Sequence, residues 1–229
     1  MPGESFEERK RRAARIVRRL ARAYPDARCA LHYETPFQLL VATILSAQCT
    51  DAMVNRVTPE LFRRWGVPEK LAAAEPGEVE ALVRPTGFYR QKAKSIQSSA
   101  QDIVARFGGE VPRTLEELVT LRGVARKTAN VVLGNAFGIP GLAVDTHMAR
   151  VNQRLELTRE EDPVKIERDL AALVPRERWT DYTHQVIHHG RVCCRARAPR
   201  CAECPLRAEC PFPEKSGLSA RPKRAARRR

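Results

Sequence analysis

The sequence lacks any apolar run long enough to cross a membrane. Its longest apolar stretch covers residues 39–45, whereas a membrane-spanning helix needs about 20 apolar residues. The N-terminal residues MPGESFEERKRR contain no apolar segment of the secretory type, and their glutamates argue against an organelle transit peptide. We therefore expect an intracellular protein, located in the cytoplasm and nucleoid if its source is bacterial.

The sequence also lacks the alternation of apolar and polar residues that marks a half-buried β-strand. It contains no internal repeat. Apolar residues recur at helical spacing instead. One face of residues 4–24 carries Ile16, Val17 and Leu20, whereas residues 36–48 are apolar all round. A longer helix is predicted over residues 89–109, where a Gly-Gly pair stops it. The sequence thus predicts an all-α protein.

Acidic residues are few relative to basic ones. The chain has 27 Asp and Glu against 41 Lys and Arg, which gives a net charge of +14. Such an excess favours polyanionic partners, nucleic acid first, whereas good solubility alone seldom requires so large a charge of one sign. Residues 213–229 are basic and without helical periodicity, so we expect a disordered tail that adds non-specific affinity for phosphates.

A disulfide framework is not expected, because the seven cysteines are odd in number and no export signal precedes them. Four of them follow the pattern C-x6-C-x2-C-x5-C: Cys194, Cys201, Cys204 and Cys210. This spacing is compatible with zinc or with a [4Fe–4S] cluster, and Cys193 is left over. The single CxxC favours the cluster, because structural zinc usually takes two closely spaced pairs. The arginines between the first two cysteines suit contacts with phosphates: Arg195, Arg197 and Arg200.

The segment LRGVARKTANVV, residues 121–132, predicts a tight turn between two helices. Thr114 and Glu117 form a capping box that opens the first helix, which we expect to end at Gly123. The second helix is predicted to run to about Phe137, and backbone amides at its start can bind a phosphate. An ordinary helical hairpin in a bundle would show the same pattern. Lys127 lies near the start of this second, mostly apolar helix, so its amine either faces water or is held there to act as a nucleophile.

Asp145 directly precedes a predicted helix that carries Met148, Val151 and Leu155 on one face. Its simplest role is that of an N-cap. Capping does not exclude catalysis, because a capping carboxylate is also rigidly held.

Three separated segments resemble the endonuclease III family. LRGVARKTANVVLGNAFG is similar to its helix-hairpin-helix, VDTHMARV to its aspartate segment, and the cysteine pattern to its cluster loop. LLVATILSAQCTDAMVN and TGFYRQKAKSI also resemble that family, and the similarity runs in collinear order over about residues 15–212. The resemblance implies two helical domains with a DNA-binding cleft between them. One is a six-helix domain (31–140), and the other is an iron–sulfur cluster domain (1–30 with 141–212).

The resemblance also assigns roles to single residues. Lys127 falls on the nucleophile and Asp145 on the catalytic carboxylate. Gln48 matches the residue that fills the gap left by a flipped base, and Phe88 matches a wedge against the opposite strand. The further DNA contacts that it implies lie in the hairpin and the cluster loop: Arg122, Gly123, Val124, Ala125, Arg126, Thr128, Arg195, Arg197 and Arg200.

The implied activity is removal of oxidised pyrimidines from double-stranded DNA, followed by strand cleavage through a Schiff base on the lysine, as an AP lyase. The expected partner is DNA with damaged bases or abasic sites, bound by a monomer. Two alternatives remain. An adenine-mismatch glycosylase shares the cluster spacing but normally lacks the hairpin lysine, and a non-catalytic or weakly active DNA-binding paralogue would keep the scaffold.

The hairpin departs from the family's usual L-P-G-V-G at Arg122 and Ala125. We expect the methyl group at position 125 to hold a phosphate farther away and to weaken DNA binding without loss of the chemistry. Ala125→Gly should therefore tighten binding to a duplex with one abasic site, as measured by fluorescence anisotropy. Unchanged or weaker affinity would contradict this interpretation.

Overall fold

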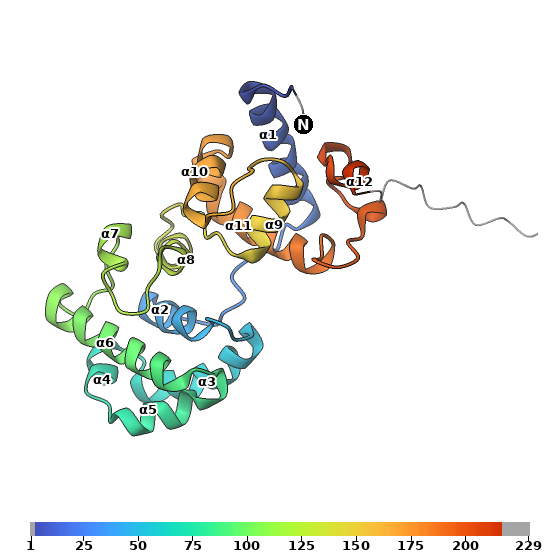
Figure 1. The fold of residues 1–229 in the computed structure, drawn as a ribbon. Helices are drawn as coiled ribbons and strands as arrows, with labels where there is room; N and C mark the ends of the chain where they lie inside the picture. Colours follow the sequence, from blue (N-terminus) through green and yellow to red (C-terminus); the bar gives the residue numbers. More distant parts are fainter. Residues whose placement is uncertain (1–2, 217–229) are drawn as a thin grey trace, which may run out of the picture. The chain divides into compact units, whose positions relative to one another are not determined.

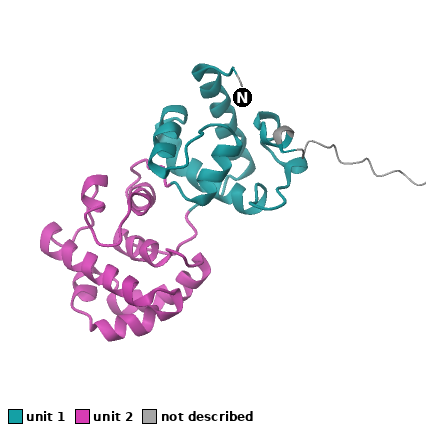
Figure 2. Ribbon diagram, in the orientation of Figure 1, with its two compact units in different colours: residues 1–28, 144–229 teal, residues 29–143 magenta. Residues whose placement is uncertain are grey.

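The computed structural model describes residues 3–216 of the chain (Figure 1). These residues contain helices and no β-strand, which confirms the all-α prediction. They form two compact units, residues 29–143 and the described parts of residues 1–28 and 144–229 (Figure 2). The unit boundaries differ by two or three residues from the domain limits that the resemblance implied. Within the described residues, every helix is too short or too polar to span a bilayer.

The unit of residues 29–143 is built around one apolar helix. Its elements are α2 (Pro36–Leu45), α3 (Asp51–Trp65), α4 (Pro68–Ala72), α5 (Pro76–Val83), the 3₁₀ turn η1 (Arg84–Thr86), α6 (Tyr89–Phe107), α7 (Leu115–Leu118) and α8 (Arg126–Ala136). Helix α2 packs against α3, α6 and α8. Its Leu39, Leu40 and Leu45 are fully buried, as the apolar pattern predicted. Gly108 ends α6 in the left-handed conformation that the Gly-Gly pair predicted.

Helix α7 is shorter than predicted. Thr114 caps it through the backbone N–H of Glu117, at 3.3 Å, but the helix ends at Leu118 rather than at Gly123. Tight turns follow, in which the N–H groups of Leu121 and Val124 donate to carbonyl groups three residues earlier. The side chains of Leu118, Leu121 and Val124 are buried. Spacing by three suits successive tight turns, so burial of these side chains overrides the helical propensity of the segment.

The second unit contains α1 (Phe6–Ala23), α9 (Thr146–Arg154), α10 (Pro163–Leu173), η2 (Arg176–Arg178), α11 (Trp179–Val192), η3 (Cys201–Glu203), η4 (Arg207–Glu209) and α12 (Phe212–Lys215). Helix α11 packs against both α1 and α9, and α1 also contacts α10. The cysteine-rich segment from 193 to 211 has only 3₁₀ turns. Helix α12 covers the start of the segment that was predicted to be a tail, and residues 217–229 lie outside the described part of the chain.

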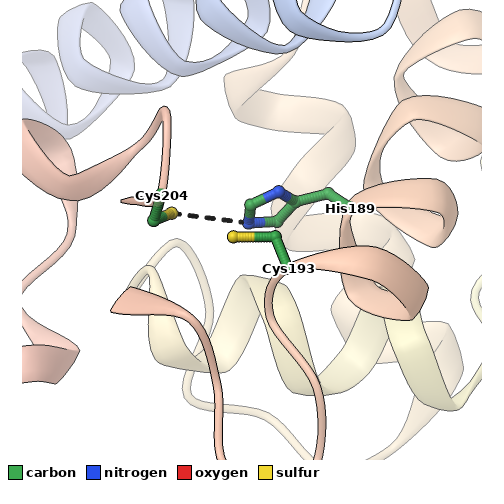
Figure 3. A group of neighbouring side chains, drawn as sticks. All are labelled: His189, Cys193 and Cys204. Atoms are coloured by element: carbon green, nitrogen blue, oxygen red, sulfur yellow. Dashed lines mark hydrogen bonds between the residues drawn. The ribbon is translucent and has the colours of Figure 1, made fainter. Parts of the chain in front are cut away.

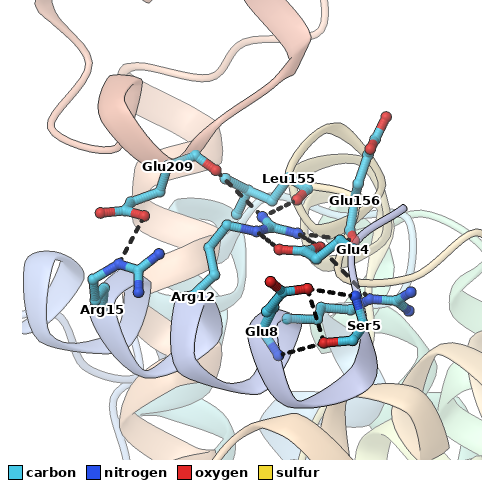
Figure 4. A network of polar contacts seen from close by, with 9 residues as sticks. Glu4, Ser5, Glu8, Arg12, Arg15, Leu155, Glu156 and Glu209 are labelled. Atoms are coloured by element: carbon cyan, nitrogen blue, oxygen red, sulfur yellow. Dashed lines mark hydrogen bonds and ion pairs between the residues drawn. The ribbon is translucent and has the colours of Figure 1, made fainter. Parts of the chain in front are cut away.

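Arg12 links the N-terminal residues before α1, the end of α9 and the end of η4 (Figure 4). It lies on the apolar face of α1 and is only 3% exposed. Its Nε and Nη2 donate to the Glu4 carboxylate at 2.6 and 2.7 Å. Its Nη1 donates to the carbonyl oxygens of Leu155, at 2.6 Å, and Glu209, at 3.3 Å. The hydrogen bond from Arg12 lowers the pKa of Glu4, so this carboxylate stays ionised and neutralises the buried guanidinium.

Gly123 is the position in the hairpin that tolerates no side chain. Its φ is +78°, and an added Cβ would lie 2.8 Å from the Cβ of Ser95 on α6. Gly138 provides a matched control, because its φ is +65° but no atom lies within 4 Å of an added Cβ. We expect Gly138→Ala to cost about 1–2 kcal/mol of unfolding free energy through backbone strain alone. Gly123→Ala should cost about 1–3 kcal/mol more because of the clash, measured by urea denaturation. Equal losses in the two variants would contradict the close packing at Gly123.

Candidate functional site

Lys127 lies in the first turn of α8, and its side chain is exposed. The N-cap residue, Ala125, has an extended backbone (φ −84°, ψ 167°) and no side-chain oxygen that could cap the first turn. Any residue adopts this conformation, so the methyl group of Ala125 does not strain the turn. An α-helix carries partial positive charge at its N-terminus. The start of α8 is therefore suited to an anion supplied from outside the chain.

The hairpin before α8 is fixed against α6. The Ser99 hydroxyl donates to the Arg122 carbonyl oxygen at 2.8 Å, and Gly123 packs directly on Ser95. Val124 is buried, and its N–H donates to the Leu121 carbonyl oxygen at 3.1 Å, so it anchors the turn. The other predicted hairpin contacts have exposed or half-buried side chains: Arg122, Ala125, Arg126 and Thr128.

Gln48 and Phe88 share an unusual backbone conformation. Both are exposed and both have positive φ, 53° for Gln48 and 47° for Phe88. Phe88 is 74% exposed, although an aromatic side chain normally gains from burial. Among the described non-glycine residues, only Glu156 and Ala198 share such a φ, and Ala198 lies within the arginine loop. Such strain, about 1–3 kcal/mol per residue, tends to gather at functional sites.

Asp145 is the N-cap of α9, as predicted, and belongs to the unit that does not contain Lys127. Its Oδ1 accepts hydrogen bonds from the backbone N–H groups of His147 and Met148, both at 2.8 Å. Its Oδ2 lies 3.5 Å from the His147 Nδ1, and the side chain remains 17% exposed. One carboxylate oxygen therefore holds the residue in place while the other stays available.

All four predicted metal ligands line one pocket, together with Cys193 and His189. The most compact set of donors in the described residues is His189, Cys193 and Cys204, whose ligand atoms lie within 4.8 Å of one another (Figure 3). Only Cys204 belongs to the predicted set, and no sequence pattern pointed to His189. Burial lowers the pKa of His189 to about 4 and raises the pKa of Cys210 to about 11. A neutral imidazole beside buried and half-buried thiols forms a candidate metal site.

Two arginines of α9 hold the loop between Cys194 and Cys201. The Arg154 Nη1 donates to the carbonyl oxygen of Arg195 at 2.7 Å, and its Nη2 donates to that of Ala196 at 3.0 Å. Arg150 donates to the carbonyl oxygen of Cys194 at 3.2 Å. Neither arginine was among the predicted functional residues, although their spacing of four places them on one helical face.

The predicted phosphate contacts of this loop are all exposed: Arg195, Arg197 and Arg200. Arg200 forms an ion pair with Glu203. The side chains of Arg195 and Arg197 have no ion-pair partner in the described part of the chain. They are therefore more available to an external phosphate than Arg200.

Comparison with known proteins assigns this arrangement to a class. Residues 41–176 match the HhH-GPD superfamily of base excision DNA repair proteins, so the chain belongs to that superfamily. It is 54% identical to the endonuclease III of Synechocystis sp. over 209 residues, which cover 91% of this chain and 95% of that protein. The chain is accordingly a member of the endonuclease III family.

Two solved structures support the assignment. The chain is 41% identical to an endonuclease III in a non-covalent complex with DNA, covering 92% of this chain and 99% of that one, with a TM-score of 0.86. It is 42% identical to an endonuclease III in a trapped covalent intermediate with DNA, again with a TM-score of 0.86, covering 91% of this chain and 98% of that one.

The capping role of Asp145 can be separated from its charge. Asp145→Ala removes the acceptor for two backbone N–H groups and should lower the unfolding free energy by about 1 kcal/mol. Asp145→Asn keeps a capping oxygen and should stay within a few tenths of a kcal/mol of the wild type. Chemical denaturation followed by circular dichroism measures both. If Asn and Ala destabilise equally, charge rather than capping holds the start of α9.

Proposed function

We propose that this base-excision DNA glycosylase removes oxidised pyrimidines from duplex DNA and then cleaves the strand at the abasic site as an AP lyase. The observation that carries the proposal is the exposed amine of Lys127 in the first turn of α8, directly after a tight turn. A similar endonuclease III forms a covalent intermediate with DNA. A lysine nucleophile would form such a bond with the sugar.

The DNA contacts follow from the charges and the backbone. The first turn of α8 binds a phosphate through its amides, and Arg122 and Arg126 add positive charge beside it. Arg195 and Arg197 bind further phosphates. The target nucleotide must leave the base stack, which costs a few kcal/mol, and damaged pairs open more readily.

Gln48 and Phe88 are suited to stabilise the opened duplex. Gln48 would occupy the space of the extruded base, and Phe88 would stack against the opposite strand. Both side chains are exposed on left-handed backbones, so neither has to leave the protein interior before it contacts DNA.

The chemistry uses the neutral form of the Lys127 amine. Its nitrogen lone pair forms a bond to C1′ of the deoxyribose, and the C1′–N bond to the base breaks with its electron pair on the departing base, which takes up a proton. Opening of the sugar gives a protonated Schiff base. Removal of a C2′ proton then drives cleavage of the C3′–O bond, which releases the 3′ phosphate by β-elimination. Water hydrolyses the remaining imine and regenerates the lysine.

Asp145 provides negative charge for this reaction. Its Oδ1 is committed to two backbone N–H groups, so its Oδ2 is the oxygen that acts. It either accepts a proton from the nucleophile or stabilises positive charge on the sugar. Asp145→Asn keeps the cap and removes the charge, so it tests this electrostatic role without loss of the helix start.

The cofactor that fits the cysteine pocket is a [4Fe–4S] cluster held by Cys194, Cys201, Cys204 and Cys210. Three guanidinium groups line the same pocket, those of Arg154, Arg200 and Arg207, and they offset the negative charge of a four-thiolate centre. The Arg154 Nη1 lies 3.4 Å from the Cys194 Sγ. When bound, the cluster supplies a covalent link across a segment that has no α-helix of its own, and so it fixes the arginine loop.

We further propose that the two units correspond to the six-helix domain and the cluster domain, and that the protein works inside the cell, where its DNA substrate lies. Residues 29–143 carry Lys127, Gln48 and Phe88, whereas the other unit carries Asp145 and the cysteines.

Lys127→Ala should abolish covalent trapping by borohydride on a duplex with one abasic site, while the wild type forms an adduct. Lys127→Arg keeps the positive charge but forms no Schiff base, so it should bind the duplex and give no adduct. Lys70→Ala is the matched control, because Lys70 is also exposed but lies on α4.

Each outcome of the trapping experiment has a distinct meaning. An adduct in both the wild type and Lys127→Ala would show that another amine is the nucleophile. No adduct in any protein, with DNA still bound, would favour a non-catalytic DNA-binding paralogue.

A further inference from the structure

Helix α1 has two faces of opposite character. Its apolar face is buried in the second unit and contains Ala13, Ile16, Val17 and Leu20. The opposite face carries four exposed arginines at positions i, i+3, i+4 and i+7: Arg15, Arg18, Arg19 and Arg22. This spacing places all four guanidinium groups on one side of the helix over two turns.

These arginines line an open, shallow groove. Its wall consists of the four arginines and Ala23 on one side and Pro205 of the cysteine-rich segment on the other. The described residues that line this groove include no carboxylate. A neighbouring depression shares Arg15, Arg19 and Pro205 but is also lined by three carboxylates, those of Glu4, Glu8 and Glu209. The lining without a carboxylate is therefore that of the arginine groove itself.

One acidic side chain lies beside the groove, and it neutralises only half of the row. The Glu209 carboxylate contacts the Nε of Arg15 at 3.0 Å (Figure 4). It also contacts the Nε of Arg19, at 3.4 Å. Within residues 3–216, neither Arg18 nor Arg22 has an ion-pair partner. Like charges at a spacing of three or four residues destabilise a helix. An external anion that bridged Arg18 and Arg22 would offset this repulsion.

The chemistry of the groove identifies the kind of anion. All four cations are arginines, whose planar guanidinium groups bind phosphate oxygens in a bidentate manner. A row two helical turns long suits a series of phosphates. A membrane surface fits less well, because the apolar face of α1 is buried against α10 and α11 and cannot insert into lipid.

We propose that the groove formed by Arg15, Arg18, Arg19, Arg22 and Pro205 binds the phosphate backbone of duplex DNA in addition to the hairpin and the cluster loop. It reads no bases and no lesion. It adds affinity for undamaged DNA, to which a repair enzyme is bound while it searches for lesions. The proposal goes beyond the proposed function and does not depend on the identity of the excised base.

The test neutralises the two arginines that have no partner and leaves the Glu209 contacts intact. Arg18→Gln with Arg22→Gln is compared with Arg168→Gln with Arg176→Gln, which removes two exposed charges from α10 and η2 of the same unit. Glutamine has nearly the helix propensity of arginine, so both proteins should fold as judged by circular dichroism. The readout is the dependence of affinity for a long undamaged duplex on salt concentration.

The Arg18 and Arg22 double variant should bind more weakly and lower the slope of log K against log salt by about 2, one for each lost phosphate contact. The control should keep the slope of the wild type. Borohydride trapping on a short abasic duplex should be unchanged in both, so failure of the lyase chemistry would be seen separately. A slope equal to that of the control would overturn the proposal. If the double variant also cosediments less with phosphatidylserine vesicles while its DNA slope is unchanged, the groove is a membrane-binding surface instead.

Discussion

The conformation of the cysteine-rich segment depends on hydrogen bonds that its backbone carbonyl groups accept from arginine side chains of distant helices. Arg12 of α1 donates to Glu209, Arg150 of α9 donates to Cys194, and Arg154 donates to Arg195. A guanidinium carries five N–H donors in a fixed plane, so one side chain can fix several carbonyl groups at once. The segment is thereby held without α-helices, its thiols line one pocket, and its Arg195 and Arg197 side chains stay exposed.

The hairpin before α8 is governed by the core rather than by its own hydrogen bonds. Burial of Leu118, Leu121 and Val124 produces the tight turns, and close packing of Gly123 on Ser95 leaves no room for a side chain. The start of α8, with Lys127 in its first turn, is therefore fixed by packing on α6. In the proposed reaction, this fixed helix start would hold the backbone of Lys127 in place when DNA binds.

The features that were predicted correctly depend on neighbours in the chain. The apolar pattern of α2, the glycine stop of α6, and the caps at Thr114 and Asp145 are all local, and the structure confirms them. The end of α7 was predicted wrongly, because the propensity of residues 119–123 for a helix is weaker than the gain from burying three side chains. The roles of Lys127, Asp145 and the four cysteines remain predictions that rest on the resemblance and on family membership.

The sequence by itself determined the helical class, the positions of most helices, the spacing of the cysteines and the excess of positive charge. These properties are set by residues within a few positions of one another or by composition. Only the tertiary structure decided which groups meet. Arg12 contacts Leu155 and Glu209, which are 143 and 197 residues away in the chain, and His189 reaches Cys204 from α11. Local propensity contains no information about such partners, because they come together only when the helices bury their apolar faces.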